Sequence, residues 1–201
     1  GIFNASTLNF NSAGAVTILE DSNMDLVGVN TAGTATLSST AALSDAGATS
    51  VAITGLGNFS GTSISIGGGT FNTGSLTFNS TGAVTILEDS SMDLVGINTG
   101  ATTLLTSTAG ISDAGAASVN VGALTVNGTS INLGGGIFNT GSLNFNSSGV
   151  VTVQEDSSTQ LSGASTASNL ALTSTGAITD TAGSSLTVTN GAGITATTSI
   201  T

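Results

Sequence analysis

The chain has 201 residues and lacks Lys, Arg, His, Cys, Trp, Tyr and Pro, while 11 Asp and Glu residues give a formal net charge of −11 at pH 7. Without a cation it cannot neutralise phosphates, which excludes nucleic-acid binding and electrostatic attraction to anionic membranes as main functions. Its apolar runs are only a few residues long, far below the roughly 20 of a spanning helix, so no membrane insertion is expected.

An internal repeat organises the whole chain. Residues 10–31 and 78–99 are identical at 19 of 22 positions, and a more diverged copy begins at Phe145. We therefore expect three repeats in one continuous solenoid, with residues 1–68 and 69–135 as the first two and residues 136–201 as an incomplete third. Because the chain starts at Gly1 and ends at Thr201 within a predicted strand, we expect it to be a segment of a longer array.

Each repeat subdivides into coils of the size found in β-solenoids. Equivalent points at Phe78, Leu105, Val126 and Phe145 are 27, 21 and 19 residues apart. This spacing predicts an all-β fold, a parallel β-helix with about three coils per repeat and almost no helix. If whole coils stack at about 4.8 Å, equivalent residues of successive repeats should lie on the order of 14 Å apart along one face.

Positions that stay apolar in all three copies and alternate by two predict the inward face of each strand. In chain order the predicted core positions are Phe3/Phe71/Phe138, Leu8/Leu76/Leu143, Phe10/Phe78/Phe145, Val16/Val84/Val151, Ile18/Ile86/Val153, Leu37/Leu105/Leu172, Leu43/Ile111/Ile178, Val51/Val119/Leu186 and Ile64/Ile131/Ile200. Two further positions become polar in the third copy and are predicted to lie at a boundary or face outward: Leu19/Leu87 (Gln154) and Met24/Met92 (Thr159).

Turns are predicted where glycine permits positive φ. The segments are Gly67-Gly68-Gly69, Gly134-Gly135-Gly136, Asn127-Gly128 and Asn190-Gly191.

All the acidic residues recur in the repeat register, many of them in a Glu-Asp-Ser turn. The simplest hypothesis is that they are solvated polar corners that keep the protein soluble. The alternative is Ca²⁺ binding, because a hard cation takes about 6 to 8 oxygen ligands. The candidate metal ligands are Glu20, Asp21, Asp25, Glu88, Asp89, Asp93, Glu155 and Asp156. Two observations weigh against this site: Gln160 replaces Asp25 and Asp93 in the third copy, and the calcium-binding nonapeptide is absent. No other cofactor is expected.

Enzyme activity is not expected, because no Arg, Lys, His or Tyr is present to bind a substrate or tune a carboxyl pKa, and a Ser nucleophile would lack a base. Ice or carbohydrate-surface binding is a second alternative, suggested by Thr34-Ala-Thr36 and Thr195-Ala-Thr197. These two pairs do not occupy equivalent repeat positions and form no row across coils, so ordinary strand Thr, with its high β-propensity, is the favoured explanation.

The short strands of the form L-x-F-x-S-x-G-A-V-T, with coils near twenty residues and Gly/Asn/Ser/Thr-rich turns, resemble bacterial filamentous-haemagglutinin-like and autotransporter-type surface adhesins. The resemblance implies a right-handed parallel β-helix, secreted to the cell surface or outside the cell. It also implies a structural segment of a fibre or giant adhesin, giving length, stiffness and surface attachment. The expected partners are other copies, joined head-to-tail or laterally into fibres, and host or abiotic surfaces.

Overall fold

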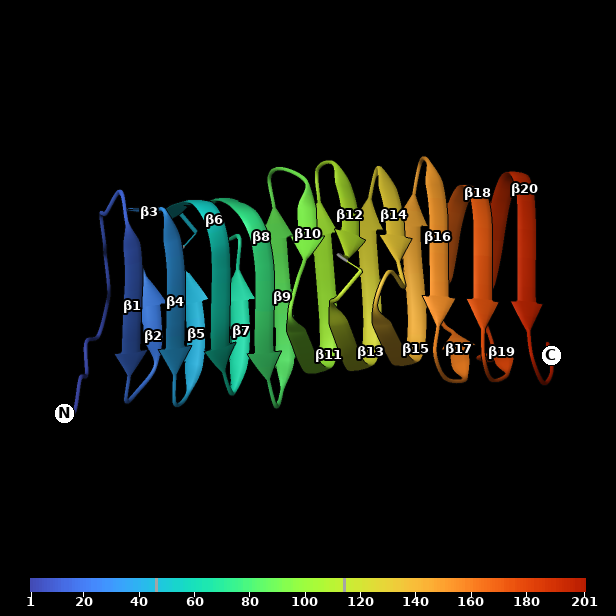
Figure 1. Cartoon of the computed structure of the whole chain (residues 1–201), viewed down its shortest axis with the longest axis horizontal. Helices are drawn as coiled ribbons and strands as arrows, with labels where there is room; N and C mark the ends of the chain where they lie inside the picture. Colours follow the sequence, from blue (N-terminus) through green and yellow to red (C-terminus); the bar gives the residue numbers. More distant parts are fainter. Residues whose placement is uncertain (46, 114) are drawn as a thin grey trace.

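The protein is an elongated parallel β-solenoid. The computed structural model describes residues 1–45, 47–113 and 115–201, which form 20 strands and no helix, and therefore no helix able to cross a membrane. All strand pairs are parallel, and the two termini lie at opposite ends of the long axis (Figure 1). The predicted all-β solenoid is confirmed, with about 9 turns of about 19 residues.

The strands follow one another with short corners between them. Their bounds are β1 Ala15–Glu20, β2 Met24–Leu26, β3 Val29–Ala32, β4 Thr34–Ser39, β5 Ala42–Asp45, β6 Ser50–Gly61, β7 Ser63–Ile66, β8 Thr70–Ser80, β9 Ala83–Glu88, β10 Met92–Leu94, β11 Ile97–Ser107, β12 Gly110–Asp113, β13 Ser118–Gly128, β14 Ser130–Leu133, β15 Ile137–Ser147, β16 Val150–Glu155, β17 Thr159–Leu161, β18 Ala164–Ser174, β19 Ile178–Asp180 and β20 Ser185–Ala196.

One column of paired residues shows how the chain winds. From Met24 the pairing passes, one turn at a time, through Leu43, Ile64, Val84, Thr103, Leu124, Leu143 and Leu161 to Asp180. Pairing also crosses both repeat boundaries, because β6 pairs with β8 and β13 with β15. With parallel strands about 4.8 Å apart, nine turns are on the order of 43 Å long.

Equivalent residues of successive repeats do not stack on one another, contrary to our expectation. Three turns connect Asn79 through Thr99 and Asn120 to Asn139, whereas the repeat equivalent of Asn79 is Asn146, seven residues farther along. The first repeat has the same offset, because three turns from Asn11 end at Asn72 and its equivalent is Asn79. Each repeat therefore makes three turns plus about a third of a turn.

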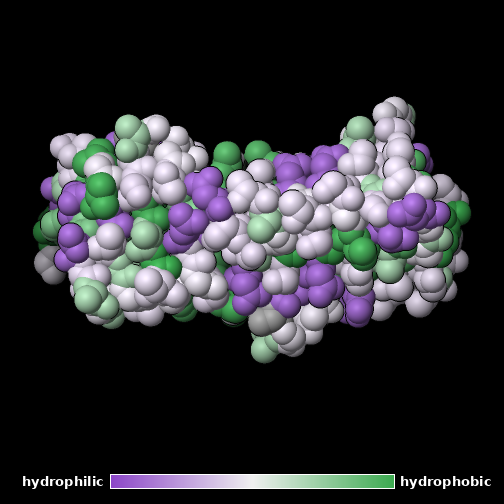
Figure 2. Space-filling view, turned by 90° about the horizontal axis from the view of Figure 1, so that it is seen from above, coloured by the Kyte–Doolittle hydropathy of each residue, from purple (hydrophilic) through white to green (hydrophobic). Residues whose placement is uncertain are grey.

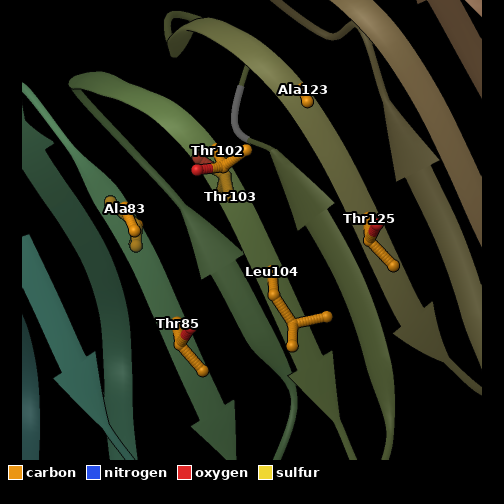
Figure 3. Close-up of a pocket in the computed structure, with 8 residues that line it drawn as sticks. Ala83, Thr85, Thr102, Thr103, Leu104, Ala123 and Thr125 are labelled. Carbon is orange, nitrogen blue, oxygen red and sulfur yellow. The ribbon is translucent and has the colours of Figure 1, made fainter.

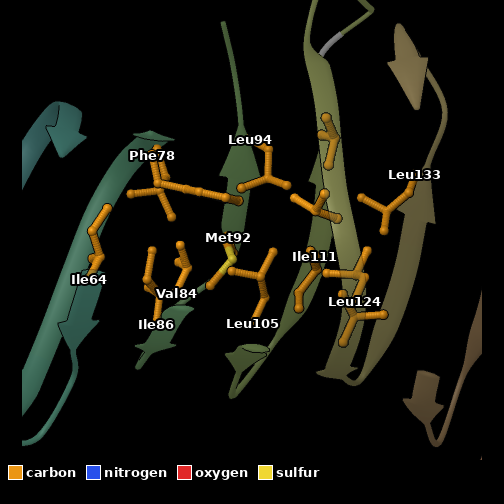
Figure 4. Packing of buried hydrophobic residues seen from close by; sticks show 14 of the residues in the cluster. Ile64, Phe78, Val84, Ile86, Met92, Leu94, Leu105, Ile111, Leu124 and Leu133 are labelled. Atoms are coloured by element: carbon orange, nitrogen blue, oxygen red, sulfur yellow. The ribbon is translucent and has the colours of Figure 1, made fainter. Parts of the chain in front are cut away.

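The predicted core positions are buried wherever a turn lies on both sides. Phe71, Phe78, Phe138 and Phe145 are fully buried, and the aliphatic positions of the inner turns are at most 4 % exposed. Figure 4 shows Phe78, Leu94, Leu105 and Ile86 directed from different strands into this common interior. Equivalent positions at the two ends are uncovered: Phe3 is 42 % and Ile200 55 % exposed, and Leu8, Val16, Ile18 and Leu186 are partly buried.

Of the two predicted boundary positions, one is confirmed and one is wrong. Leu19 and Leu87 face outward, with 66 % and 40 % exposure. Met24 and Met92 are fully buried, however, and Thr159 is 2 % exposed with no partner for its hydroxyl among the described residues. The Thr of the third repeat therefore occupies a core position rather than an outward one.

The glycine triplets are turns, as predicted, but the two Asn-Gly pairs are not. Gly67 and Gly134 have φ of 107° and 110°, and β-carbons there would strike the backbone of the next turn, so only glycine fits. Asn127-Gly128 lies in β13, where both residues pair with β15, and Asn190-Gly191 lies in β20, where Gly191 pairs with Asn169 of β18 directly after a register shift. Tertiary pairing overrides the local turn preference of Asn-Gly at both places.

Thr103 offers a stability test of this core. It is 3 % exposed, its hydroxyl has no hydrogen-bond partner among the described residues, and its repeat equivalents are the apolar Ala35 and Leu170. Thr103→Val should stabilise the fold by about 1–2 kcal/mol, because it removes an unpaired buried hydroxyl at nearly constant volume. Thermal unfolding followed by circular dichroism measures this. The outward Thr85→Val is the control, expected within about 0.5 kcal/mol of the parent, and an equal gain there would contradict the explanation.

Candidate functional site

The Glu-Asp-Ser corner at the end of β1, β9 and β16 is the most chemically distinctive feature of the chain. Each of these strands alternates inward and outward residues, and the final Glu occupies an inward position. Glu20, Glu88 and Glu155 are consequently only 1–2 % exposed, whereas the Asp after each of them is exposed. The prediction of solvated corners therefore holds for the Asp residues and is wrong for the Glu residues.

Both carboxylates of the corner accept hydrogen bonds from the preceding turn. In the second repeat the Phe71 amide donates to Asp89 Oδ2 at 2.9 Å, and the Asp89 amide donates to the Phe71 carbonyl at 2.8 Å. Two residues along, the Thr73 amide and hydroxyl donate to Glu88 Oε1 and Oε2 at 2.6 and 3.0 Å, while Ser90 Oγ donates to Glu88 Oε1 at 2.9 Å. The corner thus holds alternate amides of one strand.

The other two repeats share the amide and Ser contacts but not the Thr hydroxyl bond, because Ala5 stands in the first repeat and the Thr140 hydroxyl donates to the Ser142 carbonyl in the third. The amide donors are Phe3 to Asp21 at 2.8 Å and Ala5 to Glu20 at 3.0 Å in the first repeat, and Phe138 to Asp156 at 2.9 Å and Thr140 to Glu155 at 3.1 Å in the third. Ser22 and Ser157 each donate to the adjacent Glu at 2.8 Å.

These carboxylates take the place of a missing strand. Residues 70–73 of β8 pair with β6 on one side, but on the other side they face the corner, because β10 and β11 pair only farther along β8, at Leu76 and Asn79. An interior amide needs an acceptor, and the corner supplies two in carboxylate form. The pairing between successive turns changes register at this place. The corner therefore coincides with the one-third-turn offset of each repeat.

A buried side-chain amide that was not among the predicted site residues completes the same transition. Asn98 is fully buried; its Oδ1 accepts the Phe78 amide at 3.0 Å and its Nδ2 donates to the Val95 carbonyl at 3.0 Å. Asn30 repeats these contacts with Phe10 and Val27, and Ser165 accepts the Phe145 amide at 3.3 Å. A polar residue kept at an inward position of all three copies was the available signal.

Burial sets the protonation of the glutamates. Removal from water raises the pKa of the Glu155 carboxyl to about 7, although hydrogen bonds from Ser157 and Thr140 act in the opposite direction. Burial likewise raises the pKa of Glu88, against the hydrogen bonds from Thr73 and Ser90. Asp156 and Asp89, the neighbouring carboxylates, raise these two values further.

The remaining acids also accept hydrogen bonds from the scaffold, and all of them except Asp180 do so from the next turn. Asp45 accepts the amides of Gly67 and Gly68 at 3.0 Å, and Asp113 binds Gly134 and Gly135 in the same way. The other three each accept a serine hydroxyl, at Asp25 from Ser44, at Asp93 from Ser112 and at Asp180 from Ser184.

The candidate Ca²⁺ ligands are not gathered into a cage. Within the described residues no group of three or more Asp or Glu side chains converges closely enough to hold a metal ion. In each corner the Glu is directed inward and the Asp outward, and both already accept protein hydrogen bonds. Whether the protein binds Ca²⁺ is a question for calorimetric titration.

The surface carries shallow depressions rather than a deep cleft at the sites described. One of about 260 Å³ lies across β9, β11 and β13, where Figure 3 shows Ala83, Thr85, Leu104 and Thr125 on neighbouring strands. Another, of about 400 Å³, is lined by Asn11, Thr31, Gly33 and Thr54 together with small neighbours. Neither contains a charged side chain. Figure 2 shows apolar residues as separate spots among weakly polar ones on one face.

The Thr pairs considered for ice binding lie on different turns. Thr36 of the first pair sits between Thr17 and Asn58, so its row along the axis mixes Thr with Asn. Thr195 lies next to Thr173 in β18.

Comparison of the chain with family models, with curated proteins and with solved structures gives no match.

The buried glutamates predict a pH-dependent stability. Between about pH 4.5 and 7 the unfolded chain has ionised Glu155 while the folded chain still binds the proton, so stability falls as pH rises through this window and levels off above it. Glu155→Gln should remove this part of the slope and stabilise the fold at pH 8 by on the order of 2 kcal/mol. Urea unfolding at several pH values measures it. Gln154→Ala, at the outward position beside it, is the control that should keep the parent slope because it changes no charge; an unchanged slope in Glu155→Gln would refute the assignment.

Calorimetric titration tests the Ca²⁺ hypothesis. We expect no saturable heat from millimolar Ca²⁺, because the candidate oxygens are directed apart and a protein site for this ion needs about 6 to 8 converging oxygens. A stoichiometric heat that disappears in Asp89→Asn would instead establish a metal site at the corner.

Proposed function

We propose that this chain is a structural segment of an extracellular fibre or giant cell-surface adhesin, whose task is length, stiffness and surface presentation. The observation that supports it best is the use of the acidic groups. Asp and Glu are the only ionisable side chains of this sequence, and each of the 11 accepts a hydrogen bond from the scaffold. The chemistry that could serve a reaction is used to build the solenoid.

The one-third-turn offset supports the same role. Equivalent residues of successive repeats point in different directions around the axis, so a repeated surface feature is not collected on one face. A lattice-binding protein needs one flat face bearing the same residues turn after turn. A spacer needs only a uniform cross-section, which the continuous core of the solenoid supplies.

The resemblance to repetitive surface adhesins adds the setting: a bacterial cell surface, with self-association and contact with host or abiotic surfaces. In this proposal the chain is not an enzyme and needs no cofactor. Ca²⁺ binding and ice or carbohydrate-surface binding are the competing functions, and no observed geometry favours either over a structural role.

Tandem chains test the structural role. One, two and three copies of residues 69–135, flanked by the native first and third repeats, should give rods whose length grows by about 16 Å per added repeat, since each contributes about three and a third turns of about 4.8 Å. Small-angle scattering and electron microscopy measure this length. Particles whose radius of gyration does not grow in proportion to repeat number would contradict a stiff spacer.

A further inference from the structure

β17 in the third repeat is anchored less firmly than the strands that correspond to it. β2, β10 and β17 each follow a Glu-Asp-Ser corner, and each begins with a buried inward residue. That residue is Met24 or Met92 in the first two repeats, both fully buried, and Thr159 in the third. β17 pairs with β15 on one side and with β19 on the other, so the comparison concerns a strand that neighbouring turns cover (Figure 1).

The change from Met to Thr removes apolar contact without adding a hydrogen bond. A Met side chain buries a long apolar chain, whereas Thr offers one methyl group. Thr159 is 2 % exposed, and its hydroxyl has no partner among the described residues. Burying an unpaired hydroxyl is unfavourable. Both effects lower the stability of β17 relative to β10.

The next residue of β17 lacks a link to the following turn. In the second repeat Asp93 Oδ1 accepts the Ser112 hydroxyl at 3.0 Å, and the first repeat has the same bond. In the third repeat Gln160 lies opposite Thr179, and no side-chain hydrogen bond joins these two within residues 115–201. A hydrogen bond to a charged acceptor is therefore missing on the side of β17 that faces the next turn.

Two hydrogen bonds near this corner act in the opposite direction. Asn144 Nδ2 donates to the Ala164 carbonyl at 2.9 Å, and Ser158 Oγ accepts the Ala177 amide at 3.0 Å. Both lie at exposed positions, where water competes for the same groups, so each contributes less than a fully buried Met side chain. The balance leaves β17 as the least stable of the three strands that follow a corner.

We propose that the third corner and β17, residues 156–161, form a hinge at which the solenoid opens first and the rod bends. This inference rests on the proposed function, because a hinge matters in a segment that is stiff elsewhere. Local opening occurs where buried apolar contacts are few, and the third repeat has lost such a contact at the first residue of β17. The Met-Asp pair of the first two repeats keeps their corners closed.

Native-state hydrogen exchange tests the hinge at two matched amides. The Ser162 amide donates to the Leu143 carbonyl and the equivalent Val95 amide to the Leu76 carbonyl, both at 2.9 Å. After correction for the intrinsic rate of each residue, we expect the Ser162 amide to exchange at least about 10-fold faster than the Val95 amide. Equal rates, or faster exchange at Val95, would overturn the hinge.

Exchanging the two residues between repeats tests their part in the hinge. Thr159→Met with Gln160→Asp should bring the rate at Ser162 to within about 3-fold of that at Val95. Each new residue already stands at the equivalent position of the second repeat, so the scaffold accommodates it. An unchanged rate at Ser162 in this folded variant would overturn the assignment.

The reverse exchange and an outward control complete the set. Met92→Thr with Asp93→Gln should open the second corner and raise the rate at Val95 at least about 10-fold. Gln154→Leu copies the outward Leu87 and should leave the rate at Ser162 unchanged. If Gln154→Leu slows Ser162 as much as the β17 exchange does, the effect is not specific to β17 and the hinge falls.

Spin labels measure the bending itself, because the chain has no native cysteine. Labels at Thr125→Cys in β13 and Thr173→Cys in β18 lie on either side of β17. The equivalent pair, Asn58→Cys in β6 and Thr106→Cys in β11, lies on either side of β10. The distance distribution should be broader for the first pair than for the second. Equal widths would contradict bending at β17.

The outcome separates this inference from the proposed function. If exchange and label distances are alike at both corners while the tandem arrays of the second repeat are rods of the expected length, the hinge falls and the structural role stands. If those arrays are not rods, the structural role falls whatever the exchange rates show.

Discussion

The hydrogen bonds between corner carboxylates and strand amides are the constraint on which the rest of the solenoid depends. A parallel ladder satisfies a backbone amide only where a strand of the next turn lies opposite it. Residues 70–73 have no such strand on one side, and without Asp89 and Glu88 their amides would be buried and unpaired. Burying a glutamate is itself unfavourable, and the raised pKa of Glu155 shows how strongly the interior resists its charge. This cost is offset because the alternative is two unsatisfied amides in each repeat.

The offset that these corners allow determines how the surface is arranged. If three whole turns made one repeat, every outward residue would line up along a single face, and the like charges of Asp21, Asp89 and Asp156 would form one row. With a further third of a turn, each copy shows the same features in a new direction. Most of the polar surface then consists of Ser, Thr and Asn, which are uncharged and need no counter-ion. Because they surround the axis, the surface is similar on every side. Such uniformity is a property of a fibre segment rather than of a protein with one recognition face.

The sequence predicted the features that depend on local alternation and on the internal copies. The inward positions of Phe78, Val84 and Ile86 follow from period two, and the solenoid follows from coil length. It failed where a long-range partner decides the outcome. In the sequence Glu88 resembles part of a polar turn, because the groups that donate to its carboxylate, the amide and hydroxyl of Thr73, are 15 residues away. The third copy of Met92 is Thr, which wrongly suggests a peripheral position. The repeats show that Asn98 keeps a polar residue at its position, but only the structure shows the two backbone groups that it joins.

The acidic residues complete the ladder wherever a strand is missing between turns, and each such repair depends on a corner of the adjoining turn. The segment that these corners serve recurs along the chain, because residues 1–12 and 136–147 are identical at 9 of 12 positions. The amides of Phe3 and Phe138 are held in the same way, by Asp21 and Asp156. The requirement to satisfy the backbone therefore engages the carboxylates of every corner, and it explains why the Glu-Asp pair is kept in all three repeats.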